Sequence, residues 1–200
     1  VAVHDGDPFE IRIYNDWQKN KTKVNGFPNG SIQRGQAVGR GAWHQEKNQA
    51  IGLTPLCGLA IDAKASGSTL NANIYVGYNN PINYNTRLTV LLIEDNVPQS
   101  SPGAQSNYSS VSVGSSWLHQ HVLRGVFTSP EGRPIALTDL GKKYQKISFN
   151  NIDLSSYGVK DAANCKIVAF VNVNETITTP GVKNVLNVQS SSINQVKDWD

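Results

Sequence analysis

TLNANIYVGYNNPINYNTRLTVLLIED, residues 69–95, is the stretch that decides the fold of this chain. Apolar residues alternate here with polar or aromatic ones: the first set is Leu70, Ala72, Ile74 and Val76, and the second is Asn71, Asn73 and Tyr75. Because successive side chains of a strand point to opposite faces, this alternation predicts a half-buried β-strand. The run RLTVLLIED that follows the turn formers is almost continuously apolar, which is typical of a central strand covered on both faces.

The same kind of pattern continues through the rest of the chain beyond residue 51. The segments expected as strands are 51–63, 68–78, 86–95, 116–127, 143–150, 164–174 and 183–190. Turn-forming residues separate these segments, and no helical pattern of useful length interrupts them. We therefore predict a mainly β protein in which residues 51–200 form a seven-stranded antiparallel β-sandwich.

Residues 1–50 have an α/β rhythm instead. Short strands are expected at 1–4 and 31–35, and helices at 9–24 and 39–52. In the first helix Phe9, Ile13 and Trp17 recur at four-residue intervals, which predicts one apolar face. The periodicity changes near residue 50 without a Pro-rich linker, so we expect a boundary there between two closely packed parts.

The composition narrows the class of protein. Charged residues are 16% of the chain, below the usual quarter, and neutral polar residues are abundant, which favours a secreted or cell-envelope β protein. The 18 basic residues are spread among 15 acidic ones without forming a basic stripe, so nucleic acid is not an expected partner. No apolar run approaches the ~18 residues of a membrane-spanning helix. The chain opens inside an expected strand, which predicts a targeting segment upstream of Val1.

Two cysteines, Cys57 and Cys165, leave two alternatives open. A disulfide between them would close a loop of about a hundred residues, worth about 4–5 kcal/mol in the chain-entropy model, and an oxidising compartment would permit it. The alternative is a pair of reduced thiols that act as small buried hydrophobic groups. Neither cysteine belongs to a C-x-x-C pair, which argues against a redox catalyst.

A pair of histidines stands in WLHQHVLRG, residues 117–125. In a regular strand His119 and His121 would lie side by side on one face, and two imidazoles can contribute to a zinc or copper site. A closed zinc site takes three or four ligands, and neither His4, His44 nor the scattered carboxylates are spaced to converge on the pair. We expect a structural role for the two imidazoles, with no metal and no cofactor.

The same region carries a resemblance to a known family. LTVLLIEDNV (88–97), a Gln/Ser/Gly-rich loop and WLHQHVLRGVF (117–127) resemble the outer-membrane-protein-28-related family of Bacteroidetes envelope lipoproteins. That family has a His-x-His-Val-Leu-Arg strand, matched here by His119, His121, Val122, Leu123 and Arg124. VAVHDGDPF (1–9), VNGFPNGSIQR (24–34) and a Trp-led helix resemble the second half of the thioredoxin-like domain that precedes the sandwich in such proteins.

The resemblance implies a thioredoxin-like segment, a C-terminal sandwich and an outer-membrane location with a lipid anchor upstream of this chain; it implies no established catalytic site. Pro28 matches the cis-proline of thioredoxin-like folds, which would make Phe27 and Pro28 a docking edge for the substrate of a dithiol. The strand and helix that would carry that dithiol lie upstream of Val1. This chain pairs no activated thiolate with a resolving cysteine, so we prefer the alternative that Pro28 only begins a strand.

Three hypotheses of function follow. The preferred one is a non-catalytic outer-membrane or cell-surface protein that binds other envelope proteins or surface ligands, or joins a surface assembly, through the long loop 96–115 with Tyr108 and Trp117. The second is a thiol–disulfide oxidoreductase whose dithiol lies upstream. The third is a glycan-binding surface protein that uses Tyr75, Tyr78 or Tyr84, an idea that rests on fold analogy.

Overall fold

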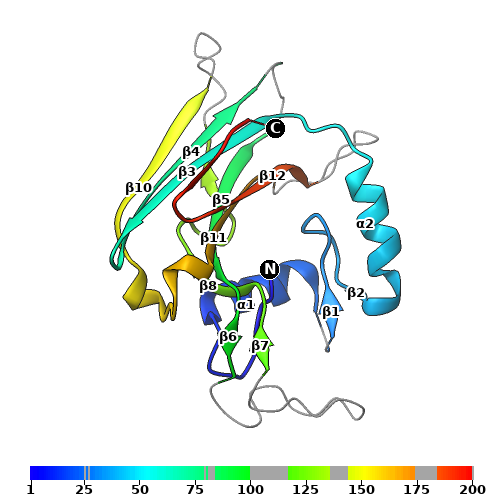
Figure 1. The fold of residues 1–200 in the computed structure, drawn as a ribbon. Coiled ribbons are helices and arrows are strands. Elements are labelled where there is room, and N and C mark those ends of the chain that lie inside the picture. The colour runs from blue at the N-terminus through cyan, green and yellow to red at the C-terminus, as the bar shows by residue number, and fades with distance from the viewer. Residues whose placement is uncertain are drawn as a thin grey trace.

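Two antiparallel β-sheets face one another in the computed structural model, which describes residues 1–24, 26, 28–78, 80, 84–99, 117–135, 144–173 and 184–199 (Figure 1). The four-stranded sheet has the order β10 (Gln145–Asp153), β4 (Thr69–Gly77), β3 (Gly58–Ser66), β13 (Gln195–Lys197). The five-stranded sheet has the order β12 (Val185–Ser192), β11 (Cys165–Val173), β5 (Thr86–Glu94), β8 (Val122–Val126), and β9 (Arg133–Pro134) also pairs with β5. The 3₁₀ helices η2 (Leu154–Tyr157) and η3 (Ala162–Asn164) lie between β10 and β11.

The expected seven-stranded sandwich is confirmed, with the short strands β9 and β13 added to it. These two strands are two and three residues long, too short to show an alternation that sequence alone would reveal. The first strand begins at Gly58 rather than at residue 51, because the preceding helix continues to Ile51.

The core lies between the two sheets. The apolar set of β4 points inward, and its members Leu70, Ala72, Ile74 and Val76 are each 0% exposed. Alternate residues of β5 meet them from the opposite sheet, namely Leu88, Val90 and Leu92. The remaining residues Leu91 and Ile93 of β5 belong to a second cluster on the outer face of the five-stranded sheet. The central strand is therefore covered on both faces, as its continuous apolar run predicts.

The N-terminal segment covers that outer face. It comprises α1 (Arg12–Thr22), β1 (Asn29–Gly30), β2 (Val38–Gly39), η1 (Arg40–Ala42) and α2 (Trp43–Ile51). The strand expected at 31–35 is instead the turn between β1 and β2, where Gln33 and Arg34 have left-handed φ angles of 57° and 55°. The strand expected at 1–4 is reduced to one parallel bridge between Ala2 and Val122.

The predicted apolar face of the first helix is wrong. α1 begins at Arg12, so Phe9 precedes it, and Ile13 is 68% exposed. Tyr14 is the buried aromatic residue and packs against the outer cluster of the five-stranded sheet. Arg34 also joins the N-terminal segment to the sandwich, because its guanidinium donates to the carbonyl of Pro130 and lies 5.1 Å from the centre of the Phe170 ring. The division at residue 50 stays a prediction.

Candidate functional site

The strand that carries the two motif histidines is broken between them. β7 (Leu118–His119) ends before Gln120, and β8 begins at Val122. His121 has a left-handed φ of 57°, which interrupts the side-chain alternation of a regular strand. His119 is buried, at 5% exposed, whereas the side chain of His121 is 57% exposed. The prediction that both imidazoles share one face is wrong, because it assumed an unbroken strand.

His119 belongs to a small aromatic cluster with the first residues of the chain. Its ring centre lies 5.5 Å from that of His4 and 5.1 Å from that of Phe9. Nδ1 of His4 is 2.6 Å from Oδ2 of Asp7, which holds the His4 ring in place. Burial and the neighbouring His4 lower the pKa of His119 below its ordinary value, while Asp7 acts in the opposite direction. The buried ring is therefore neutral at neutral pH.

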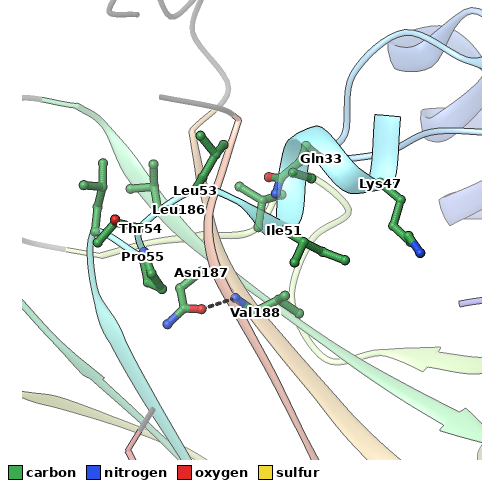
Figure 2. Close-up of a pocket in the computed structure, with 12 residues that line it drawn as sticks. Gln33, Lys47, Ile51, Leu53, Thr54, Pro55, Leu186, Asn187 and Val188 are labelled. Carbon is green, nitrogen blue, oxygen red and sulfur yellow. Dashed lines mark hydrogen bonds between the residues drawn. The ribbon is translucent and has the colours of Figure 1, made fainter. Parts of the chain in front are cut away.

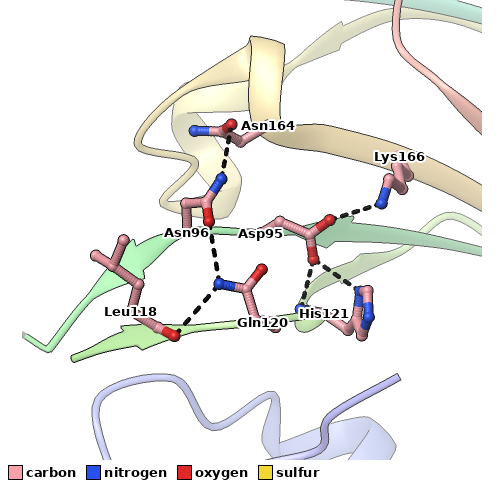
Figure 3. Close-up of polar contacts among 7 residues, drawn as sticks. All are labelled: Asp95, Asn96, Leu118, Gln120, His121, Asn164 and Lys166. Atoms are coloured by element: carbon pink, nitrogen blue, oxygen red, sulfur yellow. Dashed lines mark hydrogen bonds and ion pairs between the residues drawn. The ribbon is translucent and has the colours of Figure 1, made fainter.

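His121 contacts the turn that follows β5 (Figure 3). Its backbone N–H and its Nδ1 each lie 2.7 Å from Oδ1 of Asp95, and Nζ of Lys166 lies 2.7 Å from Oδ2. Burial raises the pKa of Asp95, but the hydrogen bonds from Lys166 and His121 outweigh it and hold this pKa below its ordinary value. Next to this group, Nε2 of Gln120 donates to Oδ1 of Asn96 over 3.0 Å.

Arg124 is the third polar residue of the motif and lies in a buried ion pair. Its Nε donates to Oε2 of Glu94 over 2.7 Å, and the two side chains are 7% and 1% exposed. The second oxygen of Glu94 accepts the backbone N–H groups of Lys160 at 2.7 Å and Asp161 at 2.6 Å. The carboxylate thus joins β8 to the segment before η3.

The motif residues therefore fasten separate segments of the chain rather than form a ligand set. His119 contacts residues 4–9, His121 the turn after β5, and Arg124 the end of β5. Within the part of the chain that the structure describes, no three His, Cys, Asp or Glu side chains are grouped so as to hold a metal ion. This arrangement accounts for the motif by packing and hydrogen bonding.

The other residues singled out from the sequence are scattered. Tyr108 and Phe27 lie outside the described residues. Trp117 is 45% exposed and directly precedes β7, which pairs with β6 (Val97–Pro98), so the two ends of the long loop meet at this short hairpin. Pro28 is exposed and directly precedes β1.

The two cysteines are free thiols that lie at opposite ends of β12. The backbone N–H of Leu56, next to Cys57, donates to the carbonyl of Leu186, whereas the carbonyl of Cys165 accepts from the N–H of Ile193. Ile193 is seven residues beyond Leu186, a separation of about 20 Å along a strand. A disulfide requires Cα atoms within about 7 Å, so of the two alternatives the geometry favours a pair of buried reduced thiols. Burial, followed by the nearby carboxylate of Glu94, raises the pKa of the Cys165 thiol to about 12.

An apolar groove of about 410 Å³ lies between the end of α2, residues 53–56 and β12 (Figure 2). We call it the α2–β12 groove. Large apolar side chains at its surface are exposed to solvent: Ile51 is 72%, Val188 53% and Leu56 38% exposed. No local sequence pattern predicts this site, because α2 and β12 are more than 130 residues apart in the chain.

β12 is an edge strand of the five-stranded sheet, and the groove runs beside that edge. The N–H of Leu56 already bonds to the edge, at 3.2 Å from the carbonyl oxygen of Leu186. Further along, the N–H of Val188 donates to Oδ1 of Asn187 at 2.7 Å, and the N–H of Ser190 donates to Oε1 of Gln189 at 3.1 Å. Two consecutive outward donors of this edge are therefore bonded to side-chain amides rather than to another strand.

Comparison with known proteins gives two matches and one absence. Residues 15–197 match the family model described as outer membrane protein Omp28. Among solved structures, HBP35 of Porphyromonas gingivalis has a similar fold, with a TM-score of 0.72 at 18% identity over 96% of this chain and 62% of that one. This chain thus spans less than two thirds of the HBP35 structure. A similarity at 18% sequence identity shows a shared fold and nothing more about function. No curated protein matches.

Among the described residues, no helix is both long enough and apolar enough to cross a bilayer.

Proposed function

This chain belongs to the outer membrane protein Omp28 family and is a protein of the bacterial cell envelope, and we propose that it is a non-catalytic binding protein that takes up an extended segment of another envelope protein in the α2–β12 groove. The observation that carries the proposal is the row of outward backbone groups on β12. An extended peptide can add to such an edge as a further strand and gain main-chain hydrogen bonds.

Two of the outward donors of this edge, the N–H groups of Val188 and Ser190, are already bonded to side-chain oxygens. Residues two apart in a strand present their N–H groups on the same side, and Val188 and Ser190 have this spacing. The side-chain oxygens of Asn187 and Gln189 now occupy these donors, and the carbonyls of an incoming strand would replace them. Side-chain caps of this kind also protect a free edge from uncontrolled aggregation, so the pairing is reserved for a partner that fits the groove.

The groove determines which side chains such a partner would carry. Its exposed apolar residues Ile51, Leu56 and Val188 would cover alternate apolar side chains of the partner strand. Lys47 is the one charged residue among the described residues that line it. We therefore expect a segment with apolar residues at every second position and a carboxylate near Lys47.

The oxidoreductase hypothesis has less support from the thiols of this chain. A catalytic thiol needs a lowered pKa and access to its substrate, but Cys57 and Cys165 are buried and the pKa of Cys165 is raised to about 12. The loop hypothesis stays a prediction, because Tyr108 lies outside the described residues while Trp117 is exposed. Deletion of residues 99–113 tests that alternative within the same binding assay.

The test begins with selection of linear peptides from a displayed random library on the folded protein, followed by measurement of the Kd of the selected peptides. Ser190→Pro removes one outward N–H at an edge position that tolerates proline, and Ser190→Ala is the matched control that keeps it. Loss of one net backbone hydrogen bond of about 0.5–1.5 kcal/mol weakens binding by roughly two- to tenfold. Val188→Ser should weaken binding as well, whereas Ile13→Ser should not, because Ile13 is an exposed apolar residue on α1, away from the groove.

Two results would count against the groove. One is that the selected peptides bind Ser190→Pro and Val188→Ser as tightly as the unchanged protein. The other is that deletion of 99–113 abolishes binding while both groove variants retain it, which would favour the long loop instead.

A further inference from the structure

A second cleft, of about 270 Å³, lies on the outer face of the four-stranded sheet, and we infer that it binds saccharides. Its floor is the small residue Ala60 of β3, and its aromatic side chains are Tyr75 of β4, Tyr144 just before β10 and Trp199 after β13. We call it the aromatic cleft. It shares no lining residue with the α2–β12 groove, so this inference is independent of the proposed function.

The sheet register puts these groups together. Ala60 pairs with Tyr75, so the two side chains stand on the same face of adjacent strands. Gly58 makes room for the indole of Trp199, because a Cβ atom at this glycine would lie 3.0 Å from Cε3 of the indole. Despite these contacts Tyr144 is 49% and Trp199 45% exposed. A cluster of exposed aromatic rings at a concave surface marks a binding site more often than isolated exposed residues do.

A positive charge beside the rings argues against a cationic ligand. The ring centres are 5.6 Å apart for Tyr75 and Tyr144, 6.0 Å for Tyr144 and Trp199, and 6.5 Å for Tyr75 and Trp199. Two of these pairs are edge-to-face, and the third, Tyr144 with Trp199, is tilted. Nζ of Lys146 lies 5.8 Å from the Tyr75 ring centre and adds a positive charge at this position. A cationic ligand of the aromatic-cage type therefore does not fit.

The polar groups around the rings favour a neutral ligand rich in hydroxyl groups. The cleft offers the carboxylates of Asp62 and Asp198, and the ammonium group of Lys146 lies beside Tyr75, so both acceptors and donors are present. Oδ1 of Asp62 is buried and accepts no hydrogen bond from the described residues, although Nζ of Lys64 lies 3.7 Å away. Charges of both signs give the cleft no strong net charge that would select an ion.

A sugar ring can contact both the aromatic rings and the charged groups of the cleft. Its C–H face carries weakly positive hydrogen atoms that contact the negative face of an aromatic ring, while its hydroxyl groups bond to carboxylates and ammonium groups. The volume lies near the lower end of the roughly 300–1,000 Å³ found for ligand pockets, so one sugar residue of a longer glycan would occupy it.

The aromatic cleft also corrects the glycan site expected from the sequence. Of the three tyrosines expected there, Tyr75 lies in the cleft, but Tyr78 and Tyr84 pack against the sandwich core. Burial raises the pKa of Tyr78 to about 12, and its hydroxyl group donates to Thr86. Trp199 and Tyr144 could not be assigned to the site from the sequence, because they come from the ends of two different strands.

The test uses the whole chain and four neutral oligosaccharides: maltotetraose, cellotetraose, mannotetraose and chitotetraose. Titration calorimetry and tryptophan fluorescence should show saturable binding of at least one of them. Trp199→Ala and Tyr144→Ala should each weaken it by about tenfold or more, since removal of one stacked ring costs about 1.4 kcal/mol. The matched control is Trp117→Ala, because Trp117 has the same 45% exposure and lies elsewhere, and Ser190→Pro should also leave binding unchanged.

The inference is overturned by any of three results. The first is the absence of saturable binding for all four oligosaccharides. The second is an unchanged Kd in a Trp199→Ala variant whose far-UV circular dichroism matches that of the unchanged protein. The third is that phosphocholine, added as a quaternary ammonium probe, binds at the cleft while the sugars do not.

Discussion

Replacing Arg124 with methionine should destabilise the protein by about 3 kcal/mol, because it leaves the carboxylate of Glu94 buried without its cation. Breaking a buried ion pair by removal of one partner costs about 3–5 kcal/mol. Glu94 is 1% exposed, so water cannot replace the lost guanidinium. The backbone N–H groups of Lys160 and Asp161 still donate to Oε1, which places the expected loss at the lower end of that range.

A second substitution separates the charge from the packing. Glu94→Gln in the Arg124→Met background removes the buried charge, while the amide oxygen still accepts a backbone N–H. The double variant should therefore be more stable than Arg124→Met alone. Arg133→Met is the matched control, because Arg133 is an exposed arginine on β9, and surface substitutions change stability by about 0.5 kcal/mol or less.

Urea unfolding followed by tryptophan fluorescence measures these differences. At this chain length each kcal/mol lowers the Tm by about 2–4 °C, so Arg124→Met should melt roughly 6–12 °C earlier. Equal losses in the free energy of unfolding for Arg124→Met and Arg133→Met would contradict this prediction. It also fails if Glu94→Gln destabilises the Arg124→Met variant further, since the cost would then not come from an uncompensated charge.

Three further predictions follow from buried groups. His119 has a folded-state pKa below the ordinary 6.5, so the free energy of unfolding should fall as the pH drops below about 6.5, and urea midpoints at pH 7.5 and 5.0 should differ less in His119→Phe. Because the pKa of Cys165 is raised to about 12 by burial, Ellman's reagent at pH 8 should find that thiol unreactive in the folded protein and count two thiols in urea; none in urea would mean a disulfide. A Cβ atom on Gly125 would overlap the Tyr157 ring, so Gly125→Ala should lower the free energy of unfolding by about 1–3 kcal/mol, and by clearly less in a Tyr157→Ala background.

The sandwich was predictable because its signals are local. Alternation in β4 and continuous apolar character in β5 report how each strand is buried, and no knowledge of its neighbours is needed. The orientation of His121 was not predictable in this way. In its left-handed conformation the backbone N–H of His121 donates a hydrogen bond to Asp95, which is 26 residues earlier in the chain. Histidine has a modest preference for that conformation, so the break had no sequence signal of its own.

Both candidate sites were beyond the reach of sequence patterns for a related reason. The α2–β12 groove needs one helix end and one distant strand edge, and the aromatic cleft needs Tyr144 and Trp199 at the ends of different strands. A pattern that reports burial cannot report which exposed side chains of separate elements will meet. The resemblance carried by the histidine motif did identify the family, because it depends on residue identity rather than on geometry.

The α2–β12 groove and the aromatic cleft lie on different surfaces of the sandwich. The N-terminal segment lies over the outer face of the five-stranded sheet, and the motif residues His119, His121 and Arg124 hold neighbouring segments in place there. The free edge of β12 and the outer face of the four-stranded sheet are two further surfaces that carry exposed apolar or aromatic groups. Because these two surfaces share no lining residue, loss of peptide binding and loss of sugar binding should be separable by substitution. A single variant on one surface that abolished both activities would mean that they depend on each other through the fold.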